Sequence, residues 1–140
     1  MLQEFKFSDA RKNLTAIIDQ VQTNLPIVIR RRKNSEKDSL LIPTDMLNEL
    51  ISAEFKPKFF KEDDGTVTLA IELLGLAVNA ADKNKAVSAL VDEVIEYAKE
   101  YMENRVLYYN SSNRKTHLPY ILKILLCDNK VQVKELLGFA

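Results

Sequence analysis

The first 30 residues change from a strand-like to a helix-like spacing of apolar positions. Residues 4–7 alternate polar and apolar side chains, which predicts a short first strand. Ser8 follows where it can cap a helix, which we expect to end near Asn24 and Pro26. The apolar positions of this helix fall mainly three or four residues apart and form one stripe: Ala10, Leu14, Ile17, Ile18 and Val21.

A hairpin and a short helix are expected next. The β-branched residues at 27–29 predict a strand that runs into a basic segment, and residues 33–38 form a polar loop. Residues 39–42 are predicted to be the returning strand. Thr44 can cap a short helix over residues 45–53. The first module is therefore β-α-β-β-α.

The second module opens with another predicted hairpin. The dipeptide Asp64-Gly65 signals a turn between a strand at residues 59–60 and a strand at residues 66–72. The second of these strands alternates cleanly, so its buried face is expected to carry Val67, Leu69 and Ile71. Residues 76–79 predict a further strand.

The strongest helical pattern lies between residues 82 and 103. Apolar residues repeat every three or four positions along one side of it, and acidic residues dominate the other side. Residues 104–115 are expected to form a polar connection. Pro119 suits the first turn of a further helix, and Asp128 can cap a last helix that Gly138 ends.

These elements predict an α+β protein in two parts. Pro57 interrupts the helical periodicity around residues 52–61, which marks a boundary between domains 1–54 and 55–140. We expect a dimerising N-terminal module, followed by a C-terminal domain made of a small strand hairpin and helices.

Composition narrows the possible chemistry. Of the 140 residues, 46% are hydrophobic and 29% are charged, as in folded proteins. The single cysteine, Cys127, excludes an internal disulfide and a multi-cysteine zinc site. The single histidine, His117, leaves little material for metal or acid–base chemistry. We therefore expect no cofactor and no enzymatic activity. The absence of a long apolar run or a signal-like leader predicts a cytoplasmic protein with no membrane partner.

Charge is distributed unevenly although the net charge is zero. Residues 1–37 hold eight basic and four acidic groups, a balance of +4, and residues 38–140 hold 12 basic and 16 acidic groups, a balance of −4. This asymmetry favours a polyanion as partner at one end and a different partner at the other.

Two basic features could contact nucleic acid. Arg11 lies in the first turn of a predicted helix, and a run of cations follows the second strand. Both have ordinary alternatives, namely a solvated arginine on a capped helix and a charge run that protects a strand edge. The candidate DNA-binding residues are Arg11, Lys12, Arg30, Arg31, Arg32 and Lys33.

Three segments of the first module together resemble the N-terminal region of Phd/YefM-type antitoxins. Residues 7–14 (Phe-Ser-Asp-Ala-Arg-Lys-Asn-Leu) resemble the family signature, in which an aromatic residue and Ser/Thr lead into acid-Ala-Arg and then Asn-Leu. Residues 26–31 resemble its Pro-apolar-apolar-Ile-Thr-Arg strand, with Arg30 where the family often has threonine. Residues 40–50 resemble its closing strand and short helix. The hairpin loop departs from the family pattern because it is longer and lacks the usual glycine.

This resemblance implies an antitoxin of a type II toxin–antitoxin system. Such proteins are homodimers that bind a cognate toxin through a C-terminal segment and repress their own operon by binding operator DNA. Arg11 and Arg31 match the operator-contacting arginines of the family. Residues 108–120 also resemble a feature of larger Phd-like antitoxins.

The C-terminal half offers candidate contacts to a toxin. It holds all five tyrosines and the acidic side of the long helix, which could meet a basic partner. The alternatives are that the tyrosines pack beneath a loop and that the acidic side is simply solvated. The candidate toxin-binding residues are Glu93, Glu96, Glu100, Tyr108, Tyr109 and Tyr120.

Two other classes of function remain open at this stage. One is a small RNA-processing or nucleotide-binding enzyme that uses the C-terminal domain, and the lone His117 argues against it. The other is a dimeric scaffold that does not bind DNA.

Overall fold

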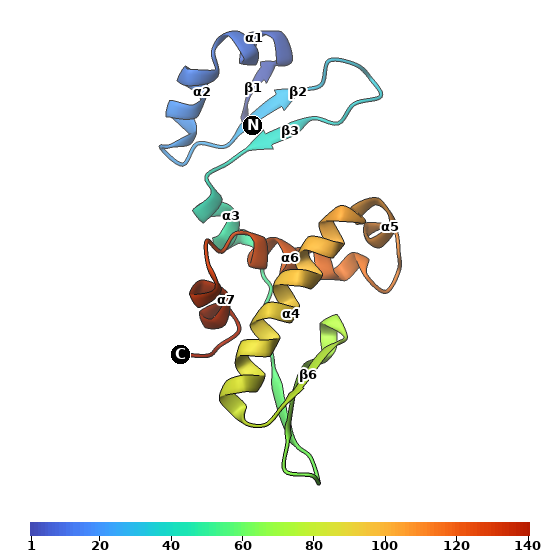
Figure 1. Ribbon diagram of the computed structural model, residues 1–140. Helices are drawn as coiled ribbons and strands as arrows, with labels where there is room; N and C mark the ends of the chain where they lie inside the picture. The colour runs from blue at the N-terminus through green and yellow to red at the C-terminus, as the bar shows by residue number, and fades with distance from the viewer. The chain divides into compact units, whose positions relative to one another are not determined.

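Two three-stranded sheets organise the chain, one in each of two separate units (Figure 1). The computed structural model describes all residues 1–140 and divides them into unit 1, Met1–Leu50, and unit 2, Ile51–Ala140. The division falls after Leu50, a few residues before the boundary expected from Pro57. Helices and strands occur together in both units, so the predicted α+β class is confirmed.

Unit 1 places two consecutive helices beside a sheet of order β1-β2-β3. Strand β1 (Gln3–Lys6) pairs in parallel with β2 (Ile27–Arg30), and β3 (Ser39–Leu41) pairs antiparallel with β2. Helices α1 (Phe7–Lys12) and α2 (Leu14–Val21) lie between β1 and β2 in the sequence, and α3 (Thr44–Leu50) follows β3.

The predicted single helix after the first strand is wrong, because it breaks at Asn13. The Asn13 side chain donates a hydrogen bond to the Asp9 carbonyl at 2.9 Å, and its backbone leaves helical geometry at φ −116° and ψ 25°. A local bond of this kind competes with the helical ladder. The predicted cap at Ser8 is also wrong, because α1 begins at Phe7 directly after the strand.

The core of unit 1 is small. Its buried side chains are Ala10, Ile17, Val21 and Ile27. Two members of the predicted apolar stripe are not among them, because Leu14 is 52% exposed and Ile18 is 39% exposed. Helix α2 therefore presents apolar surface on two sides, and only one side is covered within the chain.

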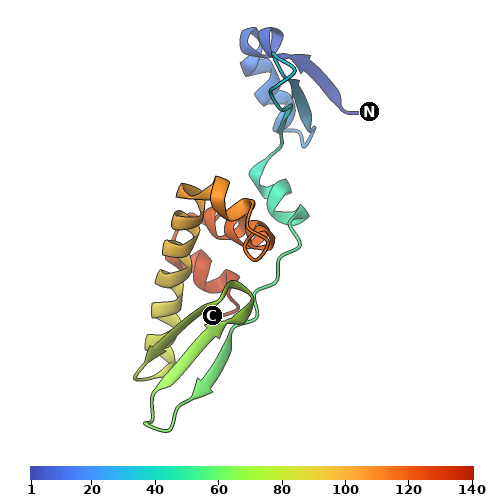
Figure 2. The same ribbon diagram turned by 90° about the vertical axis from the view of Figure 1, so that its right-hand side faces the viewer.

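Unit 2 packs a long helix against its sheet. Strands β4 (Lys58–Lys61), β5 (Val67–Ile71) and β6 (Leu76–Ala80) form an antiparallel sheet in chain order. A 3₁₀ turn, η1 (Glu72–Leu74), joins the last two strands, and Gly75 takes the left-handed conformation that ends it. Figure 2 shows the three strands lying along α4 (Lys83–Glu103).

Four shorter helical segments complete unit 2. They are α5 (Arg105–Tyr109), η2 (Lys115–His117), α6 (Leu118–Leu125) and α7 (Lys130–Leu136). Helix α4 packs against β5, β6, α6 and α7, so it forms the centre of the unit. No helix in the structure has both the length and the apolar content that a bilayer crossing requires.

Some helix ends of unit 2 agree with the sequence prediction and others do not. Asp82 caps α4, since its carboxylate accepts the Lys85 backbone N–H at 2.9 Å. The last helix is capped by Asn129 rather than by Asp128, because the Asn129 side chain accepts the Gln132 N–H at 3.0 Å. The predicted polar connection at 104–115 contains α5, which is too short to show a period.

Candidate functional site

Four basic residues of unit 1 lie where β1 meets α1 and where β2 enters its hairpin loop. They are Lys6, Arg30, Arg31 and Arg32, and they border an open hollow of about 780 Å³. Its lining residues come from these two chain segments: Glu4 to Asp9 and Arg30 to Arg32. The hollow thus combines the first turn of α1 with the arginine run.

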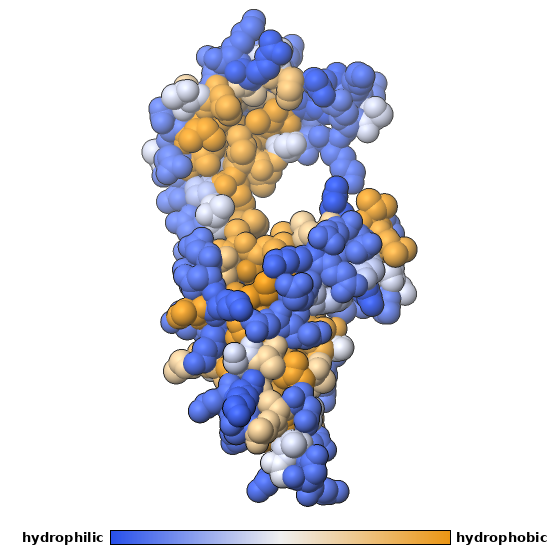
Figure 3. All heavy atoms as spheres, viewed as in Figure 1, coloured by the Kyte–Doolittle hydropathy of each residue, from blue (hydrophilic) through white to orange (hydrophobic).

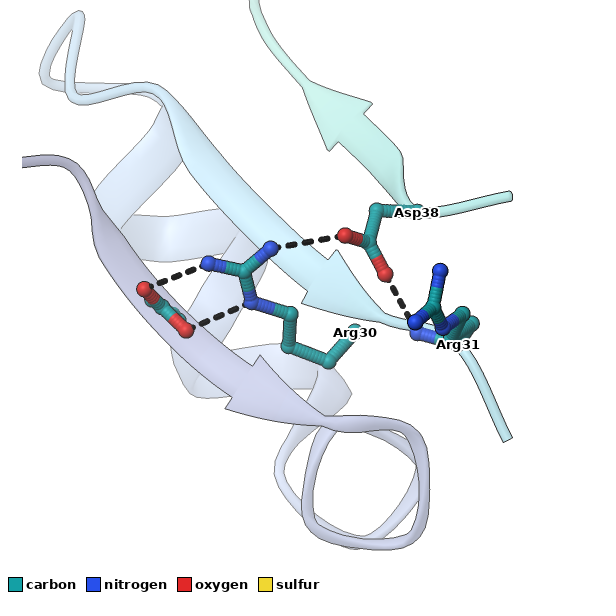
Figure 4. Close-up of polar contacts among 4 residues, drawn as sticks. Arg30, Arg31 and Asp38 are labelled. Carbon is teal, nitrogen blue, oxygen red and sulfur yellow. Dashed lines mark hydrogen bonds and ion pairs between the residues drawn. The ribbon is translucent and has the colours of Figure 1, made fainter. Parts of the chain in front are cut away.

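Arg30 does not point freely into this hollow, because two carboxylates hold its guanidinium. Its Nε and Nη2 donate to the two Glu4 carboxylate oxygens at 2.6 and 2.7 Å, and its Nη1 donates to Asp38 at 2.6 Å. Figure 4 shows Arg30 reaching Asp38. Three of the five guanidinium N–H groups of Arg30 are therefore used within the chain, and its charge is shared with two carboxylates, which makes Arg30 a weaker candidate for DNA contact than its exposed neighbours without acid partners.

Asp38 fixes the start of the hairpin loop. Its other carboxylate oxygen accepts the Arg31 backbone N–H at 2.8 Å (Figure 4). This backbone bond, together with the Arg30 bond, holds the Asp38 pKa below its ordinary value. The Arg30 bond likewise lowers the pKa of Glu4, and both acids raise the pKa of Arg30. The three side chains tie β1, β2 and the residue before β3 together.

Arg32 is held more loosely. Its guanidinium lies 4.5 Å from the centre of the Phe7 ring, and Nη2 lies 3.5 Å from Glu36. Glu36 also accepts the Arg32 backbone N–H at 3.1 Å. These contacts keep the side chain at the surface with its charge still accessible, since it is mostly exposed.

The remaining candidate cations of unit 1 are exposed and make no ion pair. They are Arg11, Lys12, Arg31 and Lys33. The excess positive charge is nevertheless local. Unit 1 as a whole has eight basic and seven acidic groups, 8 − 7 = +1, and unit 2 has 12 and 13, 12 − 13 = −1. Any attraction of a polyanion to unit 1 must come from these exposed cations rather than from its net charge.

The acidic side of α4 is exposed, as expected. Glu93 makes no ion pair, Glu96 pairs with Lys99 at 3.2 Å, and the neighbouring Asp92 pairs with Lys130 of α7 at 2.6 Å. Glu100 accepts a hydrogen bond from the Tyr108 hydroxyl. The carboxylates therefore form a surface stripe that reaches from the middle of α4 to α5.

Most of the tyrosines pack inside unit 2. Tyr97 and Tyr101 are buried, and Tyr108 and Tyr120 are half-buried. The Tyr120 ring meets Phe55 edge-on at 5.2 Å between ring centres. Tyr109 is the one exposed tyrosine, at 43%. For Tyr108 and Tyr120 the structure thus shows the packing role that was left open beside toxin contact.

His117 is buried within this aromatic cluster. Its Nδ1 lies 2.7 Å from the Tyr97 hydroxyl. Burial lowers the pKa of His117, and the nearby Arg114 charge adds to this effect, while a hydrogen bond with the Leu73 backbone opposes it. Burial also raises the pKa of the Cys127 thiol. No group of three or more His, Cys, Asp or Glu side chains is placed to hold a metal ion.

A second hollow, of about 500 Å³, was missed by sequence reasoning. It lies among β4, α4 and α7, and its apolar walls include Phe59, Val131 and Phe139. Phe59 meets Phe139 edge-on at 5.9 Å, although these residues are 80 positions apart in the sequence. Only the tertiary fold brings them together, so no local pattern could reveal this hollow.

Comparisons with known proteins assign the chain to a family. A crystal structure described as an antitoxin part of a toxin/antitoxin system, from Syntrophomonas wolfei subsp. wolfei, is 31% identical. The similarity covers 96% of this chain and 95% of that chain, with a TM-score of 0.83. No curated protein matches the chain. The sequence model of the Phd-like family, described as antitoxins of RelE/RelB toxin–antitoxin systems, matches residues 1–138, and the chain therefore belongs to this antitoxin family.

Proposed function

We propose that this antitoxin neutralises its cognate toxin by direct binding through unit 2 and represses its own operon by binding operator DNA through unit 1. This is the arrangement of a type II system in the cytoplasm. Family membership implies the toxin partner. The observation that carries the DNA part is the set of exposed cations of unit 1 that have no acid partner, namely Arg11, Lys12, Arg31 and Lys33.

The DNA part depends on the different contacts made by the four adjacent cations Arg30, Arg31, Arg32 and Lys33, here called the basic run. Because Glu4 and Asp38 hold Arg30, the strand end is fixed, and the following Arg31 and Lys33 side chains remain available. Arg11 lies in the last turn of α1 and not, as the sequence predicted, in the first turn of a helix, so the helix N-terminus does not contribute to its contact. Arginine side chains on such a fixed frame can contact phosphates and, in the major groove, the edge of guanine.

A homodimer would double this surface. The core of unit 1 has only four buried side chains, and several large apolar side chains are exposed, as Figure 3 shows in orange on the part of the chain before α3. A unit of this size gains stability by covering such surface with a second copy. A two-fold dimer would present Arg11 and Arg31 twice and would fit a pseudo-palindromic operator.

The toxin part rests on the exposed stripe of α4. Glu93, Glu96 and Glu100 offer negative charge along one side of the central helix of unit 2. Such a stripe complements a basic substrate groove, and proteins that act on RNA need basic surfaces because they bind phosphates. Tyr109 is the exposed aromatic residue beside it.

An enzymatic role is less favoured. Antitoxin family membership points to a regulatory protein. The only histidine, His117, is buried and shares a hydrogen bond with the Tyr97 hydroxyl. A buried histidine with a satisfied ring nitrogen is typical of a structural role. No observation separately favours a scaffold that does not bind DNA.

Operator binding can be tested with full-length protein and the DNA upstream of its gene. Replacing Arg11 and Arg31 together with alanine should weaken binding by roughly 1–3 kcal/mol for each arginine that reads a base, and by less for a phosphate contact. Wild-type affinity should also fall steeply as salt increases. Fluorescence anisotropy measures both effects.

A matched control removes the same charge from unit 2. Lys61→Ala with Lys85→Ala takes two exposed lysines from positions remote in sequence from the basic run. This variant should keep wild-type affinity. Equal loss in the two double variants would mean that DNA responds only to total charge, and an absence of wild-type binding would remove the repressor role.

A further inference from the structure

The most exposed large apolar side chains of unit 2 lie together on α5. Val106 is 74% exposed and Leu107 is 67% exposed, and Tyr109 in the same helix is 43% exposed. In Figure 3, orange atoms cover the place where Figure 1 draws α5. Isolated exposed apolar residues are common, but a pair next to an exposed aromatic residue forms a patch.

This patch is held in place by the inward side of the same short helix. The Tyr108 hydroxyl donates to Glu100 of α4, and its ring meets the Tyr101 ring edge-on at 5.5 Å. The Arg114 guanidinium covers the Tyr108 ring at 4.1 Å. Tyr108 therefore fastens α5 to the end of α4, while Val106 and Leu107 face outward.

The residues that follow α5, up to His117, are also held in place by hydrogen bonds. The buried Tyr101 donates its hydroxyl to the Arg114 carbonyl at 2.9 Å, and His117 is bound to the buried Tyr97. The Asn110 side chain donates to the Val106 carbonyl at 2.6 Å, which closes the last turn of α5. We call residues 104–117 the α5 segment.

Such fastening matters because a five-residue helix is unstable on its own. The contacts of Tyr101, Tyr108 and Arg114 order the segment before any partner arrives. Binding through an ordered segment avoids the entropy cost of immobilising its side chains. Well-packed apolar side chains presented in this way are typical of the residues that dominate protein interfaces.

Charge indicates the chemistry of the partner. The α5 segment carries three cations and no carboxylate: Arg105, Arg114 and Lys115. Arg114 is committed to the Tyr108 ring, while Arg105 and Lys115 are exposed on either side of the apolar patch in the sequence. A complementary surface therefore has an apolar recess with acidic groups at its rim.

We propose that the α5 segment is the apolar anchor of the toxin interface, with Val106 and Leu107 inserted into an apolar, acid-rimmed recess of the toxin. This inference rests on the proposed toxin binding by unit 2 and adds a second contact beside the acidic stripe of α4. Glu100 joins the two surfaces, because it belongs to the stripe and accepts the Tyr108 hydrogen bond.

The test compares full-length variants binding to the purified product of the toxin gene next to this one. Val106→Ser with Leu107→Ser should raise the dissociation constant at least about tenfold, since buried interface anchors contribute most of the binding free energy. The control is Leu125→Ser with Val131→Ser, which removes exposed apolar side chains from α6 and α7. It should stay within about twofold of wild type, as rim or remote positions do.

Outcomes separate the anchor from the function on which it rests. If the wild type does not bind the toxin, direct neutralisation through unit 2 is wrong. If the wild type binds and the Val106/Leu107 variant binds as tightly as the control, the function stands and the anchor is overturned.

Two other occupants of the patch are tested on the same proteins. Light scattering would reveal a second copy as occupant if the Val106/Leu107 variant lost self-association. Sedimentation with phosphatidylserine-containing vesicles would reveal a membrane as occupant. Either result with unchanged toxin affinity also overturns the proposal.

Discussion

At the scale of single residues, the members of the basic run differ in their contacts: Arg30 is paired with two carboxylates, and Arg31 and Lys33 have no ion pair. In the parallel register Glu4 lies opposite Val28, two positions before Arg30, so Glu4 and Arg30 share one face of adjacent strands. The last antiparallel pair is Ile29 with Ser39, which places Asp38 next to Arg30 across the other strand. The sequence shows four adjacent cations, but only the strand register reveals which one is neutralised.

Asp38 can be tested as the residue that fixes the hairpin loop. Asp38→Asn removes the charge shared by Arg30 and the Arg31 amide, so the Arg31 and Arg32 amides should exchange their hydrogens faster. NMR hydrogen exchange measures this, with Asp19→Asn as an exposed control. Unchanged exchange would mean that the hairpin does not depend on this carboxylate.

The same carboxylates give unit 1 a defined response to acid. Their pKa values are lowered in the folded state, so their contribution is present at neutral pH and above the ordinary values of 4.5 for Glu4 and 3.8 for Asp38. It is lost as the pH falls through the lowered values.

His117 predicts a separate pH dependence for unit 2. Its pKa is lowered below the ordinary 6.5, so the unfolded chain binds a proton at a higher pH than the folded chain does. The neutral form stabilises the fold fully above about pH 6.5, and stability is lost as the pH falls toward the lowered value. Thermal unfolding of wild type from pH 8 to pH 5 should show this loss, and His117→Gln should flatten it. A parallel pH profile for both proteins would exclude His117 as the cause.

At the scale of elements, prediction succeeded where a pattern was long and failed where a local contact competed. The α4 pattern spans six turns and has a capping residue at its start, so its range was found closely. The helix after β1 follows helical spacing too, yet the Asn13 side-chain bond divides it. Helix α5 was missed because five residues do not display a period, although it carries the proposed anchor.

The exposed side of α2 predicts self-association through unit 1. Leu14 and Ile18 are four positions apart and therefore lie on one face of the helix, while Ile17 and Val21 are buried on the other. Wild type should be a dimer in light scattering at micromolar concentration, and Leu14→Ser with Ile18→Ser should shift it toward monomer. The control pair Leu125→Ser and Val131→Ser should leave the mass unchanged. A wild-type monomer would contradict dimerisation.

At the scale of the whole molecule, two separate cores are consistent with the proposal that the two activities are separable. Unit 2 has its own buried cluster, centred on α4, and unit 1 has a much smaller one. The family match extends over residues 1–138, so both units belong to the antitoxin and neither is an unrelated appendage. The charge balances of +4 and −4 held for residues 1–37 and 38–140, but the unit boundary lies after Leu50, and the units carry only +1 and −1. The specificity of each unit must therefore come from local surfaces.

This organisation predicts that unit 2 folds and neutralises the toxin alone. A fragment should begin at Ile51, because Phe55 is buried and packs on Tyr120, and a start at residue 55 would leave this contact at a free end. Residues 51–140 should unfold cooperatively in circular dichroism and restore growth to cells that express the toxin. Residues 1–50 should unfold cooperatively only if they dimerise. They should not restore growth, whether or not they dimerise. Growth rescue by residues 1–50, or a fragment 51–140 that folds but fails to rescue, would show that toxin binding requires unit 1.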